Sequence, residues 1–404
     1  MEKSRKPKIR FRGYTDDWEQ RKLGEVATFI NGRAYSQSEL LPSGKYKILR
    51  VGNFYTNDSW YYSDLELGEK YYANYGDLLY TWSATFGPHI WLGDRVIYHY
   101  HIWKISLSGM LEKQFAVQLL EQHKSNILSG KNGSTMVHIT KEGMEQKDVI
   151  IPQSIKEQQQ IGTFFNRIDY LITLHQRKLD KLINVKKSML EKMFPKQGST
   201  VPEIRFTGFT NDWEQRKLGE VMNVTSVKRI HQSDWTDYGI RFLRARDIVS
   251  AYKNEEPDDY LYISKEKYDE YSSISGKVSI GDMLVTGVGT IGVPYLVENS
   301  EPLYFKDGNI IWFQNEDKVF GKFLFYSFAG KSIQDFITES AGIGTVGTYT
   351  IESGKKTPIS LPNKEEQERI GLFFANLDHL ITLHQCELEK LQNIKKSMLE
   401  KMFV

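Results

Sequence analysis

The sequence is poor in cysteine and has no long hydrophobic run. Cys386 is the single cysteine among 404 residues, so no disulfide can form within the chain, and a reducing, cytoplasmic setting is expected. No stretch approaches the ~18 uninterrupted apolar residues that suggest a membrane-spanning helix. The basic N-terminal segment is not followed by the apolar run of a signal peptide.

The chain also lacks an excess of one charge. Its 53 basic and 51 acidic residues leave a net charge of +2. This balance neither requires nor excludes a nucleic-acid partner, because phosphate binding depends on local basic patches. With 40% hydrophobic and 13% aromatic residues, the chain has ample material for folded cores, and its length allows two or three domains.

Catalytic and metal-binding motifs are scarce. The chain has no GxSxG, no HExxH and no methyltransferase Asn/Asp-Pro-Pro-aromatic signature. Residues 287–292 fit GxGxxG, but a Val-Pro-Tyr sequence follows where a helix should begin, so a tight turn is expected. His99 and His101 would share a strand face, yet no cysteine or carboxylate cluster completes a metal set. These absences favour a non-catalytic protein without a bound metal or cofactor.

What the sequence does contain is a long repeated segment. Residues 161–194 recur at 370–403, 209 positions later, with most residues identical. Apolar residues recur at alternating steps of three and four, which predicts one long helix per copy with a narrow apolar seam. Two such seams in one chain most simply bury each other, as an antiparallel coiled coil with approximate two-fold symmetry. The predicted seam comprises Phe165, Ile168, Ile172, Leu179, Leu182, Met189 and Met193, matched by Phe374, Leu377, Ile381, Leu388, Leu391, Met398 and Met402.

Each seam also carries two polar residues. His175 and Lys186 in the first copy correspond to His384 and Lys395 in the second. Buried polar residues can fix the register of a coiled coil, and we predict that the two histidines approach each other near the two-fold axis. The alternative is that each histidine borders the seam and faces water. The remaining polar side of the helices is basic, and DNA, a partner subunit and solvent are equally open interpretations of it.

A second repeat precedes two bodies of unlike sequence. Residues 9–26 recur at 204–221 with three differences, and these two copies are called the lead-in segments. The bodies that follow them, at about 27–152 and 222–362, share only short similar stretches. One such stretch is YKILR at 46–50, which aligns with IRFLR at 240–244. Short aromatic and β-branched runs with Gly-Asp turns predict a small α+β domain with a mostly antiparallel sheet in each body. Apolar helical segments are expected near 111–128 and 319–337. Similar helices with unlike bodies indicate two readers of two different targets.

The body loops combine Arg, Asn, Ser, Thr and aromatic residues at equivalent places. Arg and Asn can contact guanine and adenine edges with two hydrogen bonds, and Ser and Thr reach bases or phosphates. The candidate DNA-binding residues are therefore Arg50, Asn53, Thr81, Trp82, Ser83, Thr85, Lys131, Asn132, Ser134, Arg244, Arg246, Asp247, Thr286, Thr290, Thr345, Thr348 and Tyr349.

The arrangement resembles the specificity (S) subunit family of type I restriction–modification systems. Each half begins with Trp-Glu-x-x-Lys-Leu-Gly, contains a Gly-Asp turn, and ends with a proline, a Glu-Gln pair and the long helix. The Glu-Gln pairs are Glu157-Gln158 and Glu366-Gln367, and the proline lies one residue further away in the first half. The resemblance covers essentially the whole chain.

The resemblance implies a fold and a set of partners. Two target recognition domains would be joined by helical spacers: residues 1–152 hold the first lead-in and domain, 153–196 the first spacer, 197–362 the linker, second lead-in and domain, and 363–404 the second spacer. It also implies double-stranded DNA as ligand, two modification subunits that use S-adenosylmethionine, and restriction subunits that use ATP and Mg. This chain would carry no active site. The alternative is a coiled-coil scaffold with two protein-binding heads.

Overall fold

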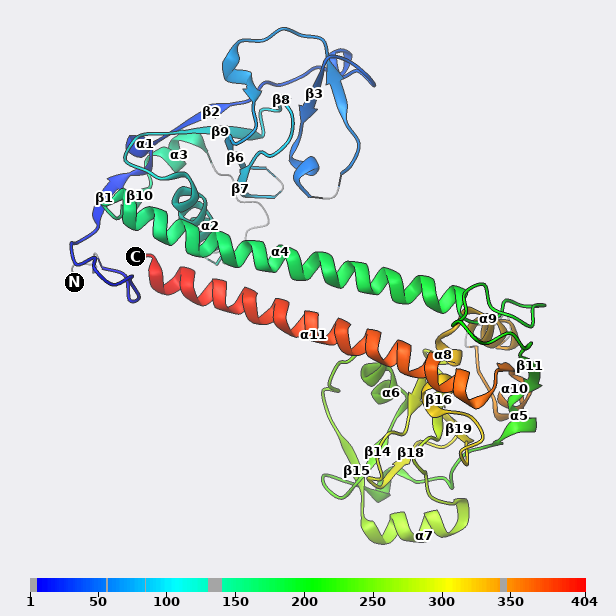
Figure 1. Ribbon diagram of the computed structural model, residues 1–404. Coiled ribbons are helices and arrows are strands. Elements are labelled where there is room, and N and C mark those ends of the chain that lie inside the picture. Colours follow the sequence, from blue (N-terminus) through cyan, green and yellow to red (C-terminus); the bar gives the residue numbers. More distant parts are fainter. Residues whose placement is uncertain (1–5, 56, 84, 130–139, 342–346) are drawn as a thin grey trace. The chain divides into compact units, whose positions relative to one another are not determined.

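The computed structural model describes residues 6–55, 57–83, 85–129, 140–341 and 347–404. The chain divides into two compact units (Figure 1). Unit 1 consists of Met1–Gln176 together with Cys386–Val404, and unit 2 of Arg177–Gln385. Both long helices pass from one unit into the other, so each unit contains part of each helix. Among the described residues, no helix has the length and apolar character to cross a membrane.

Unit 1 has a mixed α+β body, as predicted. Its strands form two four-stranded sheets, in the orders β2-β9-β6-β7 and β4-β3-β8-β5, and a two-stranded pair of β1 with β10. All pairs are antiparallel except β3 with β8. The elements are β1 Glu19–Lys22, α1 Leu23–Val26, β2 Ala27–Asn31, η1 Gln37–Glu39, β3 Tyr46–Leu49, η2 Val51–Phe54, β4 Tyr61–Ser63, η3 Glu69–Tyr71, β5 Tyr72–Ala73, β6 Leu78–Thr81, β7 Gly87–Ile90, β8 Val96–Tyr98, β9 Ile102–Leu107, α2 Lys113–Ser129, α3 Lys141–Glu145 and β10 Asp148–Ile151.

Strand β6 is buried on both faces and organises this body. Because side chains alternate along a strand, Leu78 and Tyr80 face a core that includes Phe115 of α2, whereas Leu79 belongs to the core of the second sheet. One strand therefore contributes to two hydrophobic cores. This explains why its sequence is apolar throughout instead of alternating with polar residues.

Unit 2 repeats much of this arrangement but differs in the strands and helices that surround it. Its sheets have the orders β12-β19-β16-β17 and β13-β15-β14-β18, with β11 paired to β20, and β14 with β18 is again the parallel pair. The apolar segment expected at 319–337 is interrupted at Gly330, which separates two helices. The elements are β11 Glu214–Lys217, α5 Leu218–Val221, β12 Asn223–Thr225, η4 Gln232–Asp234, β13 Trp235–Thr236, β14 Ile240–Leu243, α6 Ala245–Tyr252, β15 Leu261–Ile263, α7 Lys265–Ser275, β16 Met283–Thr286, β17 Pro294–Leu296, β18 Leu303–Phe305, β19 Ile310–Gln314, α8 Gly321–Ala329, α9 Lys331–Ser340, α10 Ile351–Lys356 and β20 Pro358–Leu361.

The repeated segment forms two long helices, α4 Ile155–Lys192 and α11 Lys364–Met402 (Figure 1). In unit 1 the start of α4 meets the end of α11, since the rings of Phe165 and Phe403 lie 6.0 Å apart. In unit 2 the end of α4 meets the start of α11, with Phe194 and Phe374 also 6.0 Å apart. The helices therefore run antiparallel within each unit, which confirms this part of the predicted fold.

The predicted seam residues differ in burial along the helices. Phe165 and Phe374 are fully buried at the bodies, and Met193 and Met402 are buried at the opposite helix ends. Ile168, Leu179, Leu377, Ile381 and Leu388 are buried as well, whereas Ile172, Leu182, Met189, Leu391 and Met398 are half-buried. The two seam residues with no exposed surface, Phe165 and Phe374, belong to the hydrophobic cores of the two units.

The structure shows the partners of the two seam lysines but leaves the prediction for the two seam histidines untested. Lys186 forms an ion pair with Asp378 at 2.5 Å in unit 2, and Lys395 forms the equivalent pair with Asp169 at 2.6 Å in unit 1. These lysines link the two helices instead of belonging to a free basic face. His175 belongs to unit 1 and its repeat equivalent to unit 2, so the approach of His175 to His384 stays a prediction.

Candidate nucleic-acid interface

Each lead-in segment is fastened to the long helix of its own unit by a buried ion pair. In unit 1, Arg10 donates from Nε and Nη2 to the two carboxylate oxygens of Glu157, at 2.7 and 2.9 Å. In unit 2, Arg205 makes the same two-pronged contact with Glu366, at 2.6 and 2.7 Å. Both carboxylates are buried and both arginines nearly so. The hydrogen bond to each carboxylate raises the pKa of the corresponding arginine above its usual value, so each arginine stays charged.

The glutamine of each Glu-Gln pair joins the helix to the body. Gln158 accepts a hydrogen bond from the backbone of Glu112 at 2.8 Å and donates to the carbonyl of Pro152 at 2.8 Å. Gln367 accepts from the backbone of Phe320 at 3.0 Å and donates to its own preceding proline carbonyl at 2.8 Å. The residues that carry the sequence resemblance are therefore a structural joint, repeated in both units, that mounts each body on its helix.

In unit 1, the candidate Arg50 lies directly after β3, and its guanidinium makes one long hydrogen bond and one contact with an aromatic ring. Its Nη2 donates to the carbonyl of Ser59 at 3.3 Å, and its guanidinium lies 4.3 Å from the centroid of the Tyr61 ring. Asn53 accepts a hydrogen bond from the backbone of Arg50 at 3.0 Å and donates to the carbonyls of Asn57 and Ser59. Asn53 thus shapes the loop, and Arg50 is the charged group that the loop presents.

The corresponding residues in unit 2 are differently engaged. Arg244 donates to Asp247 from Nε at 2.9 Å and from Nη2 at 2.8 Å, and to Asp259 from Nη1 at 2.9 Å. Arg246 pairs with Asp259 as well. Asp247 is buried at 3% exposure and bound to Arg244, which corrects its prediction as a DNA contact. Arg244 is held by two carboxylates, so its contact with DNA stays a prediction, and Arg246 is exposed.

The turn between β6 and β7 holds four candidates. Thr81 is fully buried and donates to the carbonyl of Gly87 at 3.3 Å, so its role is structural. Trp82 is half-buried, stacks on Trp103 at 5.6 Å and donates from its indole to the carbonyl of Tyr100 at 2.9 Å. The backbone of this turn is closed by a hydrogen bond from Thr85 to Ser83 at 2.7 Å. Thr85 is exposed and Ser83 half-buried, so both remain available at the surface.

The corresponding turn between β16 and β17 corrects two further predictions. Thr286 is fully buried and donates from its hydroxyl to the carbonyl of Thr290 at 2.6 Å. Tyr349 is buried at 2% exposure, and its hydroxyl pairs with that of Thr357 at 2.5 Å. Neither side chain reaches the surface, and both belong to the packing of unit 2. Thr290 and Thr348 are exposed.

The glycine-rich sequence at 287–292 forms a hairpin turn, not a nucleotide-binding loop. Strand β16 pairs with β17 in antiparallel register, and no helix begins after the last glycine. Gly287 allows a close backbone approach, because a Cβ at this position would lie 2.6 Å from the carbonyl oxygen of Tyr349. The partner approached by this turn is therefore a segment of the same unit.

His99 and His101 lie between the end of β8 and the start of β9, not on one strand. His99 and His101 lie with their rings 4.8 Å apart, and Tyr35 stacks on His99. Burial lowers the pKa of His99 to about 4, with the charges of His101 and Arg50 adding to the effect. Across the described parts of the chain, no group of three or more potential metal ligands is found. Tyr35 was missed because a single tyrosine in a loop gives no pattern.

Four candidates lie outside the described residues, namely Lys131, Asn132, Ser134 and Thr345. Apart from Lys186, the lysines and arginines of α4 are exposed: Lys156, Arg167, Arg177, Lys178, Lys181, Lys187 and Lys192. Apolar side chains are also exposed on the helices. In unit 1 these are Tyr170, Leu171 and Ile394, and in unit 2 they are Ile183, Leu372, Leu380 and Leu383.

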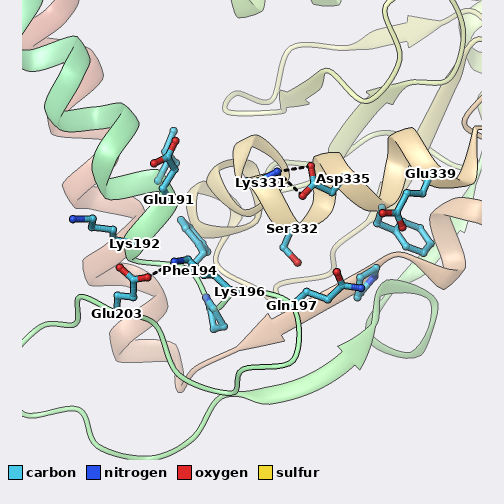
Figure 2. A pocket seen from close by; sticks show the side chains of 14 residues that line it. Glu191, Lys192, Phe194, Lys196, Gln197, Glu203, Lys331, Ser332, Asp335 and Glu339 are labelled. Carbon is cyan, nitrogen blue, oxygen red and sulfur yellow. Dashed lines mark hydrogen bonds and ion pairs between the residues drawn. The ribbon is translucent and has the colours of Figure 1, made fainter.

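A cavity of about 550 Å³ lies in unit 2 beside the linker that follows α4 (Figure 2). Phe194, Phe336 and Pro358 contribute apolar surface, while the charged lining is mixed. Lys331 pairs with Asp335 at 2.7 Å, and Lys196 pairs with Glu203. Because its lysines are balanced by carboxylates, this cavity is poorly suited to a phosphate.

Comparison with known proteins identifies the class to which this fold belongs. The model of the type I restriction modification DNA specificity domain matches residues 15–184 and again 210–393. The two matches together span most of the chain, so the protein belongs to this family. Its function is that of the specificity subunit of a type I restriction–modification system, as the sequence resemblance implied.

Individual relatives agree with this assignment. The chain is 24% identical to the type I restriction enzyme MjaVIII specificity subunit of Methanocaldococcus jannaschii, covering 95% of this chain and 91% of that protein. It is 32% identical over 156 residues to a putative type I specificity subunit of Haemophilus influenzae, covering 38% of this chain and 37% of that protein. The crystal structure of a type I S subunit from M. genitalium has the same fold, with a TM-score of 0.64, 15% identity and 99% of both chains covered.

Proposed function

We propose that the chain recognises an asymmetric DNA site in two parts, with one half-site read by each body. The observation that carries this proposal is that both bodies share the order of one four-stranded sheet, a parallel strand pair and the same contacts to the long helix, yet differ at equivalent loop positions. Arg50 is lightly held, whereas Arg244 is bound by two carboxylates. Two bodies that are attached to the helices in the same way but have different loops suit a DNA site whose two halves differ in sequence. The length of the antiparallel helices would set the unread gap, because readers on one face of B-DNA are spaced by about one helical turn.

We further propose that the chain has no active site and acts in the cytoplasm within a larger assembly. Two modification subunits that use S-adenosylmethionine would dock on the helices, and restriction subunits that use ATP and Mg would complete the complex. The exposed apolar residues on the helices support this proposal, since such groups mark interaction surfaces when they cluster. A solved chain with 16% identity and a TM-score of 0.50 comes from work on the assembly of a type I system.

Exchange of one body tests the two-part site. Residues 27–152 are replaced by the body of another specificity subunit, and the chain is expressed with its modification subunits in a host lacking other methylases. Methylome sequencing is expected to show a change in one half of the motif, with the other half and the gap unchanged. The matched control exchanges residues 222–362 and should alter the opposite half. A change of both halves by either exchange contradicts separate reading.

Insertion of one helical turn into both α4 and α11, at equivalent repeat positions, tests the gap. A longer gap between unchanged half-sites is expected, and an unchanged gap contradicts the role of the helices as a spacer. Binding of the complex to duplex DNA should also weaken steeply with salt if phosphates are contacted. The absence of specific duplex binding at any salt concentration would favour the alternative of a protein-binding scaffold.

A further inference from the structure

Three strands of the first body end at one place. Strands β3 and β8 pair in parallel, and the residues that follow them are Arg50 and His99. The backbone of His99 donates to the carbonyl of Leu49 at 2.9 Å, and Arg33 forms a parallel bridge with His99 on the other side. Arg33 lies two residues beyond the end of β2. The carboxyl ends of parallel strands are a common position for ligand sites, and here they bring two arginines beside the same histidine.

This cluster contains donors that are buried without a hydrogen-bond partner. Within the described parts of the chain, Arg33 Nη1, Tyr35 Oη and Arg50 Nε are in this condition. The other terminal nitrogen of Arg33 donates to Glu39 at 2.5 Å. A buried polar group without a partner is costly, and its presence in a folded protein calls for an explanation. Two guanidinium groups beside one carboxylate also leave this place positively charged. Three orphaned donors and an excess positive charge suit an anion.

Unit 2 offers an internal comparison at the same place. Arg244 follows β14 as Arg50 follows β3, and Lys306 donates from its backbone to Leu243 at 2.9 Å, as His99 does to Leu49. Asp247 accepts from the backbone of Arg244 at 2.8 Å, as Asn53 does from Arg50. The difference is that Asp247 also binds the Arg244 guanidinium. One amide in place of one carboxylate leaves Arg50 without the internal anion that Arg244 possesses.

We propose that Arg33, Tyr35 and Arg50 form a binding site for one phosphate group of the DNA backbone in the first body only. In the second body, Asp247 and Asp259 bind the guanidinium of Arg244, so that their carboxylates take the place of a phosphate. Guanidinium groups suit this ligand because their planar array of donors matches the oxygens of a phosphate. The proposal rests on the proposed function, since it names how one half of the DNA-reading chain is positioned on the duplex. A phosphate contact fixes register and orientation without reading bases.

The experiment measures DNA affinity as a function of salt for the full chain in complex with its modification subunits. The decisive variant is Asn53→Asp, which supplies to Arg50 the carboxylate that Asp247 supplies to Arg244. Asn53→Ser is its matched control, because it removes the same amide hydrogen bonds without adding charge. Arg50→Gln removes the guanidinium, and Arg50→Lys retains the positive charge. Amide hydrogen exchange of residues 27–129 checks that each variant is folded.

Asn53→Asp and Arg50→Gln are expected to weaken binding about tenfold at moderate salt, the effect of losing one charge-assisted hydrogen-bonded contact. Both should reduce the slope of log affinity against log salt by about 0.9, the value for one phosphate. Asn53→Ser and Arg50→Lys should keep the slope, and base preference should be unchanged in all four variants. A wild-type slope for Asn53→Asp, or equal effects of Asn53→Asp and Asn53→Ser, would overturn the proposal.

Two further arms separate the remaining possibilities. The wild-type complex is compared on its own motif and on a scrambled duplex, and equal binding to both contradicts the proposed function independently of the phosphate site. Inorganic phosphate is titrated into the protein without DNA, with hydrogen exchange of residues 33–55 as the readout. Saturable binding that depends on Arg50, together with an unchanged DNA slope in Arg50→Gln, would show a site for free phosphate and refute the assignment to DNA.

Discussion

The aromatic contacts of Phe403 predict that the end of α11 is needed to hold unit 1 together. Phe403 is buried at 4% exposure and packs against Trp18, Phe115 and Phe165, with ring centroids 6.3, 5.2 and 6.0 Å away. Truncating a buried phenylalanine to alanine costs about 3–5 kcal/mol. The lower end of this range, about 3 kcal/mol, is expected for Phe403→Ala if the surrounding rings partly fill the space.

Hydrogen exchange measured by mass spectrometry checks this loss, because it reports on the amides of each unit separately. Amides of β1, β10 and α2 that exchange through opening of unit 1 should exchange about a hundredfold faster, the factor that corresponds to ~3 kcal/mol. Val404→Ala, at an exposed residue, is the control and should have little effect. Phe194→Ala should give the same result in unit 2, where Phe194 packs against Trp213 and Phe323. Unchanged protection in unit 1 after Phe403→Ala would refute this role.

Three other predictions concern charged groups. Lys186→Asp should destabilise unit 2 by about 1 kcal/mol, since the ion pair with Asp378 is only partly buried. Adding Asp378→Lys to the same chain should restore the protection of unit 2 from hydrogen exchange, and Lys187→Asp is the control at an exposed lysine. A double variant that is no better protected than Lys186→Asp alone contradicts direct pairing. Glu157→Gln should cost about 3 kcal/mol in unit 1, because it removes the carboxylate from a nearly buried Arg10. Hydrogen exchange of unit 1 checks this, with the exposed Glu142→Gln as the control, and unchanged protection in Glu157→Gln would disprove it. Burial lowers the pKa of His89, His99 and His123 to about 4. Their unfolded value is ~6.5, so the unfolded state binds protons first as the pH falls. The stability of unit 1 should therefore be fully present above pH ~6.5 and decline toward pH ~4. Exchange corrected for intrinsic rates measures this, His123→Gln should weaken the dependence, and equal stability of unit 1 at pH 7 and pH 5 would contradict it.

The helices could be predicted because their signal is local and repeated. Residues three and four apart identify the seam without knowledge of the rest of the chain, and duplication then identifies the partner seam. The function of Lys186 could not be predicted in the same way. Its partner Asp378 lies on the other helix, and the pairing appears only once the antiparallel register is known. Sequence periodicity therefore gave the presence of a polar seam position but not the reason for it.

The loops were predicted less well because composition does not report burial. Thr286 and Tyr349 look like surface polar residues, yet the close approach allowed at Gly287 brings the Tyr349 segment into the core of unit 2. Arg50 and Arg244 occupy equivalent positions and were given the same role. The residue three positions later distinguishes them, since Asp247 binds the guanidinium and Asn53 does not. That difference is visible in the sequence, but its meaning depends on where the side chains lie.

The backbone contacts at the two helix ends have a consequence for the order of the chain. Ile9 donates to the carbonyl of Lys401 at 3.0 Å in unit 1, and Ile204 donates to that of Lys192 at 2.9 Å in unit 2. In unit 2 the two segments in contact are joined directly by the linker, whereas in unit 1 they lie far apart in the sequence. The same backbone contact between a lead-in segment and a helix end therefore forms in both units, whether or not the two segments are neighbours in the sequence. Opening the backbone between 196 and 203 should therefore preserve the contact of Ile204 with Lys192, because the equivalent contact in unit 1 forms between segments that are far apart in the sequence.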